Sequence, residues 1–568
     1  MDVSSSVSKA QHEKPVTHSA GSISRAARVR LAVVALTAIW FALAAGRPVT
    51  NPDEGRYAEI PREMLVSGDW VTPHLNGLIY IEKPPLQYWM TALAYSILGP
   101  NEWSARCWTM LSAWLNVLMV FALGRRLWGL RTGLIAAAFV ASSVLHFALG
   151  QILTLDMTFT SLMTAMLCAF CMAQLSRDAQ GKDGGRWMLG AWAMLALATL
   201  TKGVVAWVIA GSVLCMYVLW QRDWAVWRTL HLGSGLLVLL GIAAPWFILV
   251  ARADPDFLQF FFVHEHFQRY LTDSAQRVEP WWYFGAVLAA GVLPWLFQMA
   301  SALCNGWRAS VPRGRFDASR LLWLWCVFVL VFFSVSNSKL APYVLPVVPP
   351  LALLAAARES SRGVRWLSVS IGILLTCAVL WIAYVLIAPS VSHDPVIRRV
   401  VPAVRPAALA FGVIAVLGTY FWRRATVRQQ PVQAVICVAV VSFLGLSLLS
   451  ISLGHQGSLR TGRSLAAQIP AHLAAHAPIF SVRTYDQTLP FYLRRTMILV
   501  GYRGELDYGL RHDPESGIDE VTAFEQRWRD MPEAIAIMPH AIYSQLAARG
   551  LPMRVLGRDQ KRVAVSRQ

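Results

Sequence analysis

The chain has 568 residues, of which 56% are hydrophobic and only 15% are charged, and its mean hydropathy is +0.46. A water-soluble protein of this length carries more charge, so the composition indicates a polytopic membrane protein. The formal net charge of +19 does not favour nucleic acid as a partner. In membrane proteins an excess of Lys and Arg marks cytoplasmic loops and contacts with anionic lipid.

The N-terminal 30 residues are polar, basic and rich in Ser, and we interpret residues 1–30 as a cytoplasmic tail. A bilayer core about 30 Å thick is crossed by about 20 apolar residues. Thirteen segments approach these criteria and make residues 31–454 a transmembrane domain: 31–46, 107–124, 132–151, 157–176, 187–201, 204–220, 230–250, 282–303, 321–338, 340–357, 366–390, 406–422 and 432–454.

The distribution of Lys and Arg predicts how these spans are oriented. Basic residues are concentrated in the N-terminal tail and in alternate loops, which places the N-terminus in the cytoplasm. An odd number of spans then places the C-terminus outside. The apolar segment 86–99 is too short to cross, and we interpret it as a helix lying in the interface.

The composition changes after residue 454, and residues 455–568 read as a small α/β domain outside the membrane. PIFSVR (478–483), TMILVG (496–501) and AIAIM (534–538) are typical of short strands. DEVTAFEQRWRD (519–530) and AIYSQLAARG (541–550) are typical of helices, the second one ended by Gly550. Strands that alternate with helices predict a partly parallel sheet.

The densest charge cluster of the chain, NPDEGRYAEI (51–60), follows the first predicted span directly. The predicted topology places it on the outer face, together with Asp156, Lys202 and the polar stretches 260–270 and 336–350. Ionisable residues at a membrane boundary are costly and usually face a cavity. We therefore expect a shared outer cavity, whereas Glu59, Arg62 and Glu63 read as ordinary surface charges of a short helix.

The segment NPDEGRYAEIPREMLVSGDWVTPHLNGLIYIEKPPLQYW (51–89) resembles the first outer loop of GT-C polyprenyl-phosphate-sugar glycosyltransferases. It is most similar to the lipid A 4-amino-4-deoxy-L-arabinose transferase (ArnT) family. The resemblance implies a membrane all-α GT-C bundle of about 13 transmembrane helices, N-in and C-out, with a small C-terminal periplasmic α/β domain and a catalytic first periplasmic loop at 47–106.

The resemblance also implies a reaction. The chain is expected to transfer 4-amino-4-deoxy-L-arabinose from undecaprenyl phosphate to lipid A phosphates at the periplasmic face of the bacterial inner membrane, which gives resistance to polymyxin and other cationic peptides. Its expected partners are this donor, lipid A and inner-membrane lipids. EKPPLQYW (82–89) and SKLAPYVLP (338–346) resemble motifs that also occur in related transferases, so a different sugar, a protein Ser/Thr acceptor or another lipid remains an alternative.

A lipid flippase or transporter is an alternative of another class. Transporters place charged sites at mid-membrane, on broken helices and often in inverted repeats. Here the charges gather at one face and the sequence shows no repeat, which favours the enzyme.

Site residues follow from the resemblance and from the chemistry of a lipid phosphate, which calls for cations. The expected roles are catalysis by Asp53 and Asp156; donor phosphate or lipid binding by Arg56, Lys83, Tyr80, Lys339 and Tyr343; sugar or acceptor binding by Glu54, Tyr57, Lys202 and Arg269; and a structural divalent metal, Zn²⁺, on Glu82 and His264. No organic cofactor is expected. Asp53 acts either as a base or as a positioning group, and the sequence leaves both roles and the oligomeric state open.

Overall fold

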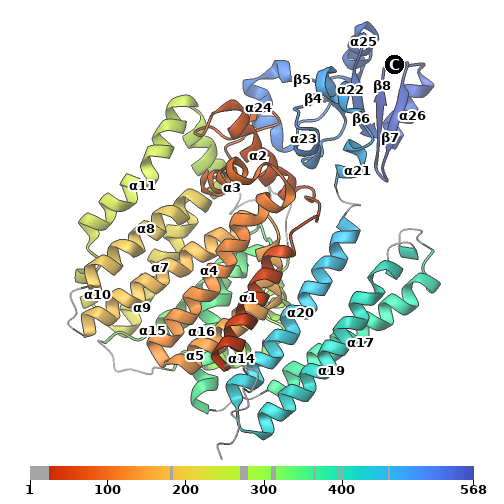
Figure 1. Ribbon diagram of the computed structural model, residues 1–568. Helices are drawn as coiled ribbons and strands as arrows, with labels where there is room; N and C mark the ends of the chain where they lie inside the picture. Colours follow the sequence, from red (N-terminus) through yellow and green to blue (C-terminus); the bar gives the residue numbers. More distant parts are fainter. Residues whose placement is uncertain are drawn as a thin grey trace, which may run out of the picture.

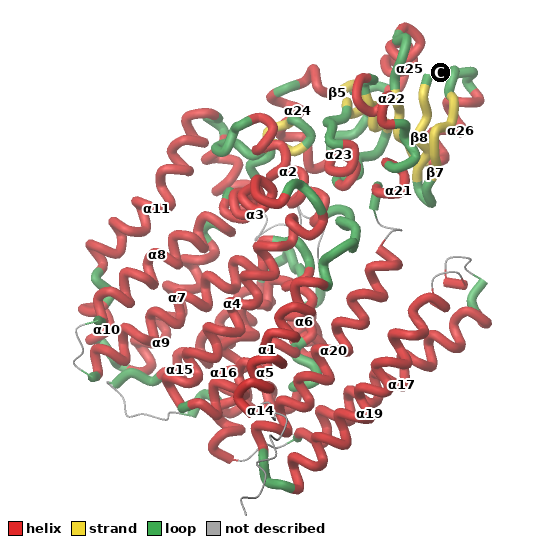
Figure 2. The backbone as a smooth tube through the Cα atoms, viewed as in Figure 1, coloured by secondary structure: helices red, strands yellow, loops and turns green. Residues whose placement is uncertain are grey.

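The computed structural model describes residues 25–179, 183–268, 279–308, 315–362, 366–393, 397–398, 401–457 and 461–567. Figure 1 shows a bundle of long helices with a small mixed domain at one end, and Figure 2 shows that strands are concentrated in this domain. The bundle comprises α1 (Arg25–Ala42), α4 (Glu102–Trp128), α5 (Leu130–Ser142), α6 (Val144–Gln151), α7 (Leu155–Asp178), α8 (Gly184–Lys202), α9 (Val205–Gln221), α10 (Ala225–Thr229), α11 (Leu232–Ala253), η1 (Gln259–Gln268), α13 (Tyr283–Gly291), α14 (Leu296–Asn305), α15 (Ala318–Val335), η3 (Ala341–Val347), α16 (Val348–Arg362), α17 (Leu367–Val391), η4 (Val401–Val404), α19 (Arg405–Val427) and α20 (Pro431–Gly457).

Each of the thirteen predicted spans falls on helix. Among the described residues, eight helical segments are long and apolar enough to cross a membrane, or nine if the bent pair of α5 and α6 is one span. The other four predicted spans lie on α1, α8, α9 and the pair α13 and α14, which are shorter, less apolar or interrupted. A multi-pass helical membrane domain is therefore confirmed.

The predicted span 282–303 differs from expectation, because it is not one helix. It consists of α13 and α14, separated by a turn that contains Pro294. Proline has no backbone N–H and disfavours the helical conformation of the residue before it, which explains the interruption. The predicted span 132–151 is bent by 60° between α5 and α6.

Two short helices and a hairpin lie across one end of the bundle, which we call the outer end. They are α2 (Asp53–Ser67), β1 (His74–Leu75), β2 (Leu78–Ile79) and α3 (Leu86–Leu98). Asn76 and Gly77 form the hairpin turn with φ of 59° and 77°, the left-handed conformation that an Asn-Gly pair adopts readily. Helix α3 confirms the predicted helix at 86–99. In Figure 1 this layer separates the bundle from the C-terminal domain.

The C-terminal domain is built on a six-stranded sheet with the order β5-β4-β3-β6-β8-β7. Strands β5, β4, β3 and β6 pair in parallel, whereas β8 and β7 are antiparallel to their neighbours, so the predicted partly parallel sheet is confirmed. The strands are β3 (Ile479–Val482), β4 (Ile498–Val500), β5 (Gly517–Ile518), β6 (Ile535–Pro539), β7 (Arg554–Arg558) and β8 (Arg562–Ser566). The β7–β8 hairpin and the two-residue β5 were not predicted.

Helices flank this sheet and bury its aromatic core. They are α21 (Arg463–Ala466), α22 (Ala471–His476), α23 (Thr488–Leu493), η6 (Gly504–Leu506), α24 (Asp507–His512), η7 (Pro514–Ser516), α25 (Val521–Asp530) and α26 (His540–Ala548). Phe480 on β3 packs against Phe524 and Trp528 on α25. Helices α25 and α26 confirm the two predicted helices, and Gly550 beyond α26 has the left-handed φ of 71° expected of a helix end.

The C-terminal domain docks directly on the outer-end layer. Gly55 in α2 lies so close to the backbone of Gln487 that a Cβ atom there would approach its carbonyl carbon to 2.6 Å. The Asn76 side chain forms two hydrogen bonds of 2.7 Å with the backbone of Met497. Residues of the first outer loop and of the C-terminal domain are therefore neighbours.

Candidate active site

Helix α2 begins at Asp53, whose side chain is 57% exposed. A carboxylate in the first turn is favoured by the positive end of the helix dipole. One turn later, Arg56 Nη1 lies 3.5 Å from Asp53 Oδ1. Asp53 is therefore a carboxylate that has a cation beside it and still faces solvent.

Arg56 is held between the two domains. It forms an ion pair with Glu505 of η6 and lies over the ring of Tyr80, 5.7 Å from its centre. Burial alone would lower the pKa of Arg56, but Tyr80, Glu505 and Glu82 outweigh burial and raise it above its usual value. The guanidinium therefore stays charged and fixed in place.

Three buried polar atoms around Arg56 have no hydrogen-bond partner among the residues that the structure describes: Arg56 Nε, Tyr80 Oη and Tyr88 Oη. Buried polar groups are nearly always satisfied in folded proteins, so these three point to a missing partner. All three can donate a hydrogen bond. An oxyanion such as a phosphate has the acceptors that they need.

Tyr57 connects this cation to the two predicted catalytic carboxylates. Its ring stacks on Tyr88 with a centroid distance of 5.6 Å. Burial raises the pKa of Tyr57, and Asp53 and Asp156 both lie near enough to raise it further. Tyr57 is therefore a neutral phenol that both predicted carboxylates, Asp53 and Asp156, influence electrostatically.

Asp156 and Lys202 form the second half of the site. Asp156 is in the first turn of α7 and Lys202 is the last residue of α8, and these two helices pack side by side. Lys202 Nζ lies 2.5 Å from Asp156 Oδ1, and both side chains are only 14% exposed. The ammonium also lies over the ring of Tyr343, 4.5 Å from its centre. Three residues predicted separately therefore form one cluster.

Two predicted phosphate ligands point toward backbone oxygens. Lys83 Nζ donates to the carbonyl of Glu82 at 2.9 Å, and the buried Lys339 donates to the carbonyl of Ser336 at 2.7 Å. An ammonium has three N–H donors, so these hydrogen bonds hold each lysine in place without using all of its donors.

Glu54 is part of a buried ion pair. Arg106, at the start of α4, donates to both carboxylate oxygens of Glu54 at 2.7 Å. Thr50 and the backbone N–H of Leu153 also donate to them. Burial would raise the Glu54 pKa, but Arg106, Arg47 and the Leu153 N–H lower it to about 2. The geometry therefore supports a role for Glu54 in positioning α2 rather than direct contact with a sugar.

The interpretation of Glu59, Arg62 and Glu63 as surface charges is wrong, because all three are buried. Arg62 donates to both oxygens of Glu59 at 2.7 and 2.5 Å. Glu63 accepts the backbone N–H groups of Asn76 and Gly77 at 2.7 and 2.8 Å. Burial and the nearby Glu59 raise the Glu63 pKa to about 8. The docked C-terminal domain covers this face, which a helix taken alone cannot indicate.

The metal prediction stays a prediction. Glu82 is half-buried close to Arg56. The backbone of His264 lies in η1, but its side chain is outside the described part of the structure, as is all of Arg269.

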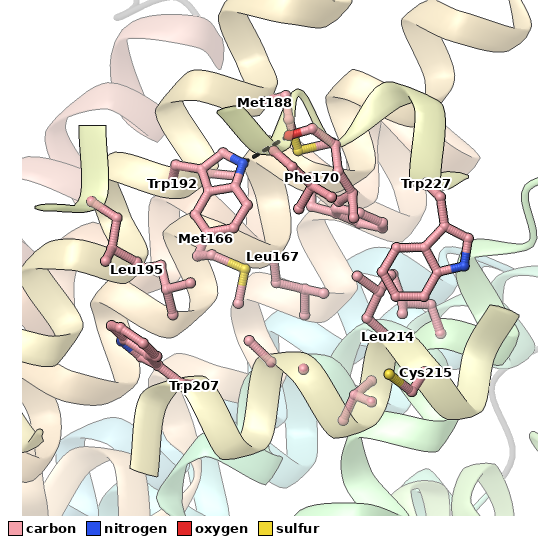
Figure 3. Close-up of a pocket in the computed structure, with 18 of the residues that line it drawn as sticks. Met166, Leu167, Phe170, Met188, Trp192, Leu195, Trp207, Leu214, Cys215 and Trp227 are labelled. Atoms are coloured by element: carbon pink, nitrogen blue, oxygen red, sulfur yellow. Dashed lines mark hydrogen bonds between the residues drawn. The ribbon is translucent and has the colours of Figure 1, made fainter. Parts of the chain in front are cut away.

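An apolar groove lies between helices of the bundle (Figure 3). It has a volume of about 300 Å³ and lies between α7, α8, α9, α11 and α15. Met166, Trp192, Trp207 and Trp227 are among the residues that line it, and none of the lining residues is charged. The groove can hold a hydrocarbon chain but offers nothing to a phosphate.

Two family models match the chain. Residues 28–261 match dolichyl-phosphate-mannose-protein mannosyltransferase, and residues 465–567 match the aminoarabinose transferase C-terminal domain. A crystal structure of ArnT from Cupriavidus metallidurans bound to undecaprenyl phosphate has 31% sequence identity and a TM-score of 0.85, covering 96% of this chain and 99% of that one. The apo form of the same protein has a TM-score of 0.84.

Curated relatives decide the family. An undecaprenyl phosphate-alpha-4-amino-4-deoxy-L-arabinose arabinosyl transferase of Pseudomonas aeruginosa is 33% identical over 492 residues, which are 84% of this chain and 86% of the relative. This chain belongs to that transferase family. A relative of the same name from Edwardsiella ictaluri is 38% identical over a shorter match, which spans about half of each protein, 55%.

Proposed function

We propose that this protein transfers 4-amino-4-deoxy-L-arabinose from undecaprenyl phosphate to phosphate groups of lipid A, at the periplasmic face of the inner membrane. Family membership makes the chain a glycosyltransferase that uses a lipid-linked sugar. The observation that carries the proposal is the set of unsatisfied donors around Arg56, next to a second cation, Lys202, and to two carboxylates.

The donor phosphate is assigned to the side of the site formed by Arg56. Arg56 Nε, Tyr80 Oη and Tyr88 Oη would each gain the acceptor that they lack. Arg is suited to this task because its charge is permanent and its N–H groups match two phosphate oxygens. Lys83, Lys339 and Tyr343 are proposed helpers. The same contacts stabilise the phosphate as it departs.

The acceptor is assigned to the side formed by Lys202. In the reaction an oxygen of the lipid A phosphate attacks the anomeric carbon of the sugar. The bond between that carbon and the donor phosphate oxygen breaks, and undecaprenyl phosphate leaves with the electron pair. Lys202 would attract the acceptor phosphate, and Arg269 is proposed to help it.

Asp53 is proposed to orient the sugar rather than to remove a proton, with Asp156 as a second catalytic carboxylate. An acceptor phosphate is already ionised near neutral pH, so the reaction needs little general base. The exposed Asp53 carboxylate is instead suited to bind the ammonium of the sugar. Tyr57 and its stacked partner Tyr88 would form an apolar wall for the sugar ring.

We further propose that residues 31–454 are the membrane domain, with its catalytic loop at 47–106, and that 455–568 lie in the periplasm. Residues 1–30 would form the cytoplasmic tail. A structural zinc ion on Glu82 and His264 is proposed to tie the first outer loop to the loop after α11.

A related transferase that glycosylates protein Ser or Thr is the second candidate. One observation favours it: Asp53 is exposed enough to act as a base toward a hydroxyl.

Mass spectrometry of lipid A from a bacterial strain that lacks its own enzyme tests the proposal. Expression of this chain should restore the aminoarabinose adduct and polymyxin resistance, and expression of the Arg56→Met variant should not. Unmodified lipid A in the strain that expresses folded wild-type protein would rule the proposal out.

A further inference from the structure

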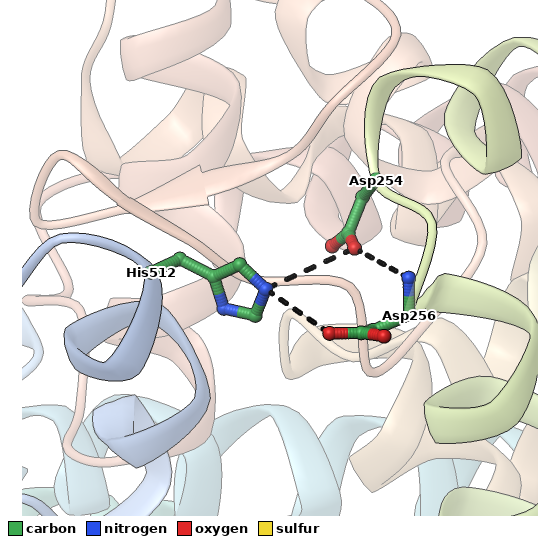
Figure 4. Close-up of side chains that lie close together, drawn as sticks. All are labelled: Asp254, Asp256 and His512. Atoms are coloured by element: carbon green, nitrogen blue, oxygen red, sulfur yellow. Dashed lines mark hydrogen bonds and ion pairs between the residues drawn. The ribbon is translucent and has the colours of Figure 1, made fainter.

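Asp254, Asp256 and His512 converge where the C-terminal domain meets the outer end of α11 (Figure 4). The two aspartates follow α11 and the histidine is the last residue of α24, so the chain brings them together only by docking its two domains. His512 Nε2 lies 3.9 Å from Asp254 Oδ1 and 3.7 Å from Asp256 Oδ2. The three ligand atoms all lie within 4.8 Å of one another.

Asp254 needs a positive charge beside it. Its side chain is only 2% exposed, and its two oxygens accept from uncharged donors, the Tyr508 hydroxyl at 2.6 Å and the Asp256 backbone N–H at 3.0 Å. Burying a carboxylate is costly unless a cation pairs with it. Within the described part of the chain, the one ion-pair partner of Asp254 is His512.

The hydrogen bonding of His512 prepares Nε2 to bind a metal. Its Nδ1 lies 3.0 Å from the backbone carbonyl of Tyr508. A carbonyl can only accept, so Nδ1 carries the proton, and in the neutral ring Nε2 presents its lone pair to the two carboxylates. The Nε2 lone pair and the two carboxylates repel one another. A divalent cation placed between them would remove this repulsion. Metal-binding histidines are typically oriented in this way, through the nitrogen that does not bind the metal.

We propose that Asp254, Asp256 and His512 bind a zinc ion that fastens the C-terminal domain to the outer end of α11. One imidazole nitrogen and two carboxylates form a common set of zinc ligands, with water as the fourth. Tetrahedral bonds of about 2.0 Å place ligand atoms about 3.3 Å apart. Small rotations of the His512 and Asp256 side chains would bring the three ligand atoms to this spacing. The Asp256 side chain is 73% exposed and so has room to rotate. Tyr508 holds Asp254 in place as an outer partner.

This site is distinct from the ion proposed on Glu82 and His264, and it goes beyond the transfer reaction. Its role is to couple two domains. Helix α24 also packs against β2 of the first outer loop, where Gly509 contacts Leu78 and Ile79. Zinc at His512 would therefore steady the loop that carries the proposed catalytic residues.

The test uses untagged, full-length protein in detergent, stripped with a chelator and titrated with ZnCl₂ while bound zinc and heat are measured. Asp256→Asn and His512→Ala should each bind about one zinc ion fewer than wild type, because each removes a ligand. His472→Ala changes an exposed histidine of the same domain and should match wild type. Equal zinc stoichiometry in wild type, Asp256→Asn and His512→Ala would overturn the proposal.

A second measurement does not depend on whether a variant folds. Wild-type protein loaded with Co²⁺ should show the visible absorption of a low-symmetry site, and hydrogen exchange in α24 should slow when zinc is added at pH 7.5. No zinc effect on α24 would contradict the metal site.

Discussion

Asp53 differs from the other acidic residues of α2 in its exposure. Glu54, Glu59 and Glu63 are buried and bonded to the chain itself, whereas the Asp53 side chain is 57% exposed beside Arg56. It is therefore the carboxylate of this helix that can reach a substrate. The buried glutamates hold α2 in place, whereas Asp53 is accessible to a substrate.

Replacement of Asp53 by Asn should reduce transfer at least about 100-fold, because the charge that orients the sugar is lost. The protein should still fold, since Asp53 makes only a 3.5 Å ion pair. Initial rates with purified enzyme measure this, and Glu533→Gln, at an exposed site in the C-terminal domain, is the control. Wild-type rates in folded Asp53→Asn protein would remove Asp53 from the mechanism.

Asp156 and Lys202 should act as a unit. Each side chain is mostly buried and is the partner of the other at 2.5 Å. Asp156→Asn and Lys202→Met should each lower kcat/KM, and the double variant should be less impaired than the product of the two effects. The expected coupling is about 1–3 kcal/mol. Strictly additive losses in this double-mutant cycle would show that the two residues work independently.

At the scale of elements, α2 is positioned from above by the C-terminal domain. Gly55 allows the close approach to Gln487, and the Asn76–Gly77 turn connects β1–β2 both to Met497 and to Glu63. A change in these contacts should therefore move the catalytic residues on α2 without touching them.

Replacement of Gly55 by Ala should separate α2 from α23, because the new Cβ would meet backbone atoms of Gln487 and Thr488 at 2.6 to 2.8 Å. Overpacking of this kind costs about 1–3 kcal/mol. Hydrogen exchange should speed up in α23, and transfer should slow. Gly190→Ala, at a helical position with open space around it, should change neither. Unchanged exchange in Gly55→Ala would contradict the close docking.

The stabilisation that depends on a protonated Glu63 should be lost as the pH rises. Burial and Glu59 raise the Glu63 pKa to about 8, so the folded state holds this proton more tightly than the unfolded state. The resulting stabilisation is complete below about pH 4.5 and is lost as the pH rises through about 8. After correction for intrinsic rates, amide exchange across α2 should be faster at pH 9 than at pH 6 in wild type. In Glu63→Gln, which cannot ionise, a similar pH dependence would contradict this account.

Sequence reasoning predicted the elements better than their contacts. Apolar length located the spans, and alternation of strands and helices located β3, β4, β6, α25 and α26. It missed the β7–β8 hairpin, whose turn is closed by Asp559 through the N–H groups of Lys561 and Arg562, and the break at Pro294. It also treated Glu59 and Glu63 as exposed, because their burial depends on the packing of α2 against α3, the β1–β2 hairpin and the C-terminal domain.

The sequence predicts which residues belong to the candidate site, but not all of the partners that hold them. Asp53, Arg56, Asp156, Lys202 and Tyr343 were all named, and the structure groups them around Tyr57 and Lys202. The partners Glu505 and Arg106 were missed. Glu505 lies in the distant C-terminal domain, and Arg106 lies at the edge of an apolar span, where a basic residue ordinarily reads as a membrane anchor.

At the scale of the whole molecule, the protein has a polar cluster at one end of the bundle and an apolar groove between its helices. The outer end carries the cations Arg56 and Lys202, which we propose bind two phosphates, and an apolar groove for hydrocarbon lies between helices of the bundle. This arrangement suits a donor and an acceptor that are both phosphorylated lipids and that both arrive from the bilayer.

The central claim is that the acceptor is a lipid phosphate. Purified enzyme with undecaprenyl-phosphate aminoarabinose should be given lipid A, dephosphorylated lipid A and a Ser/Thr peptide in turn, with sugar transfer followed by mass spectrometry. We predict transfer to lipid A alone, since a phosphate near pH 7 is already ionised whereas a hydroxyl needs a strong base. Sugar on the peptide or on dephosphorylated lipid A would contradict the account.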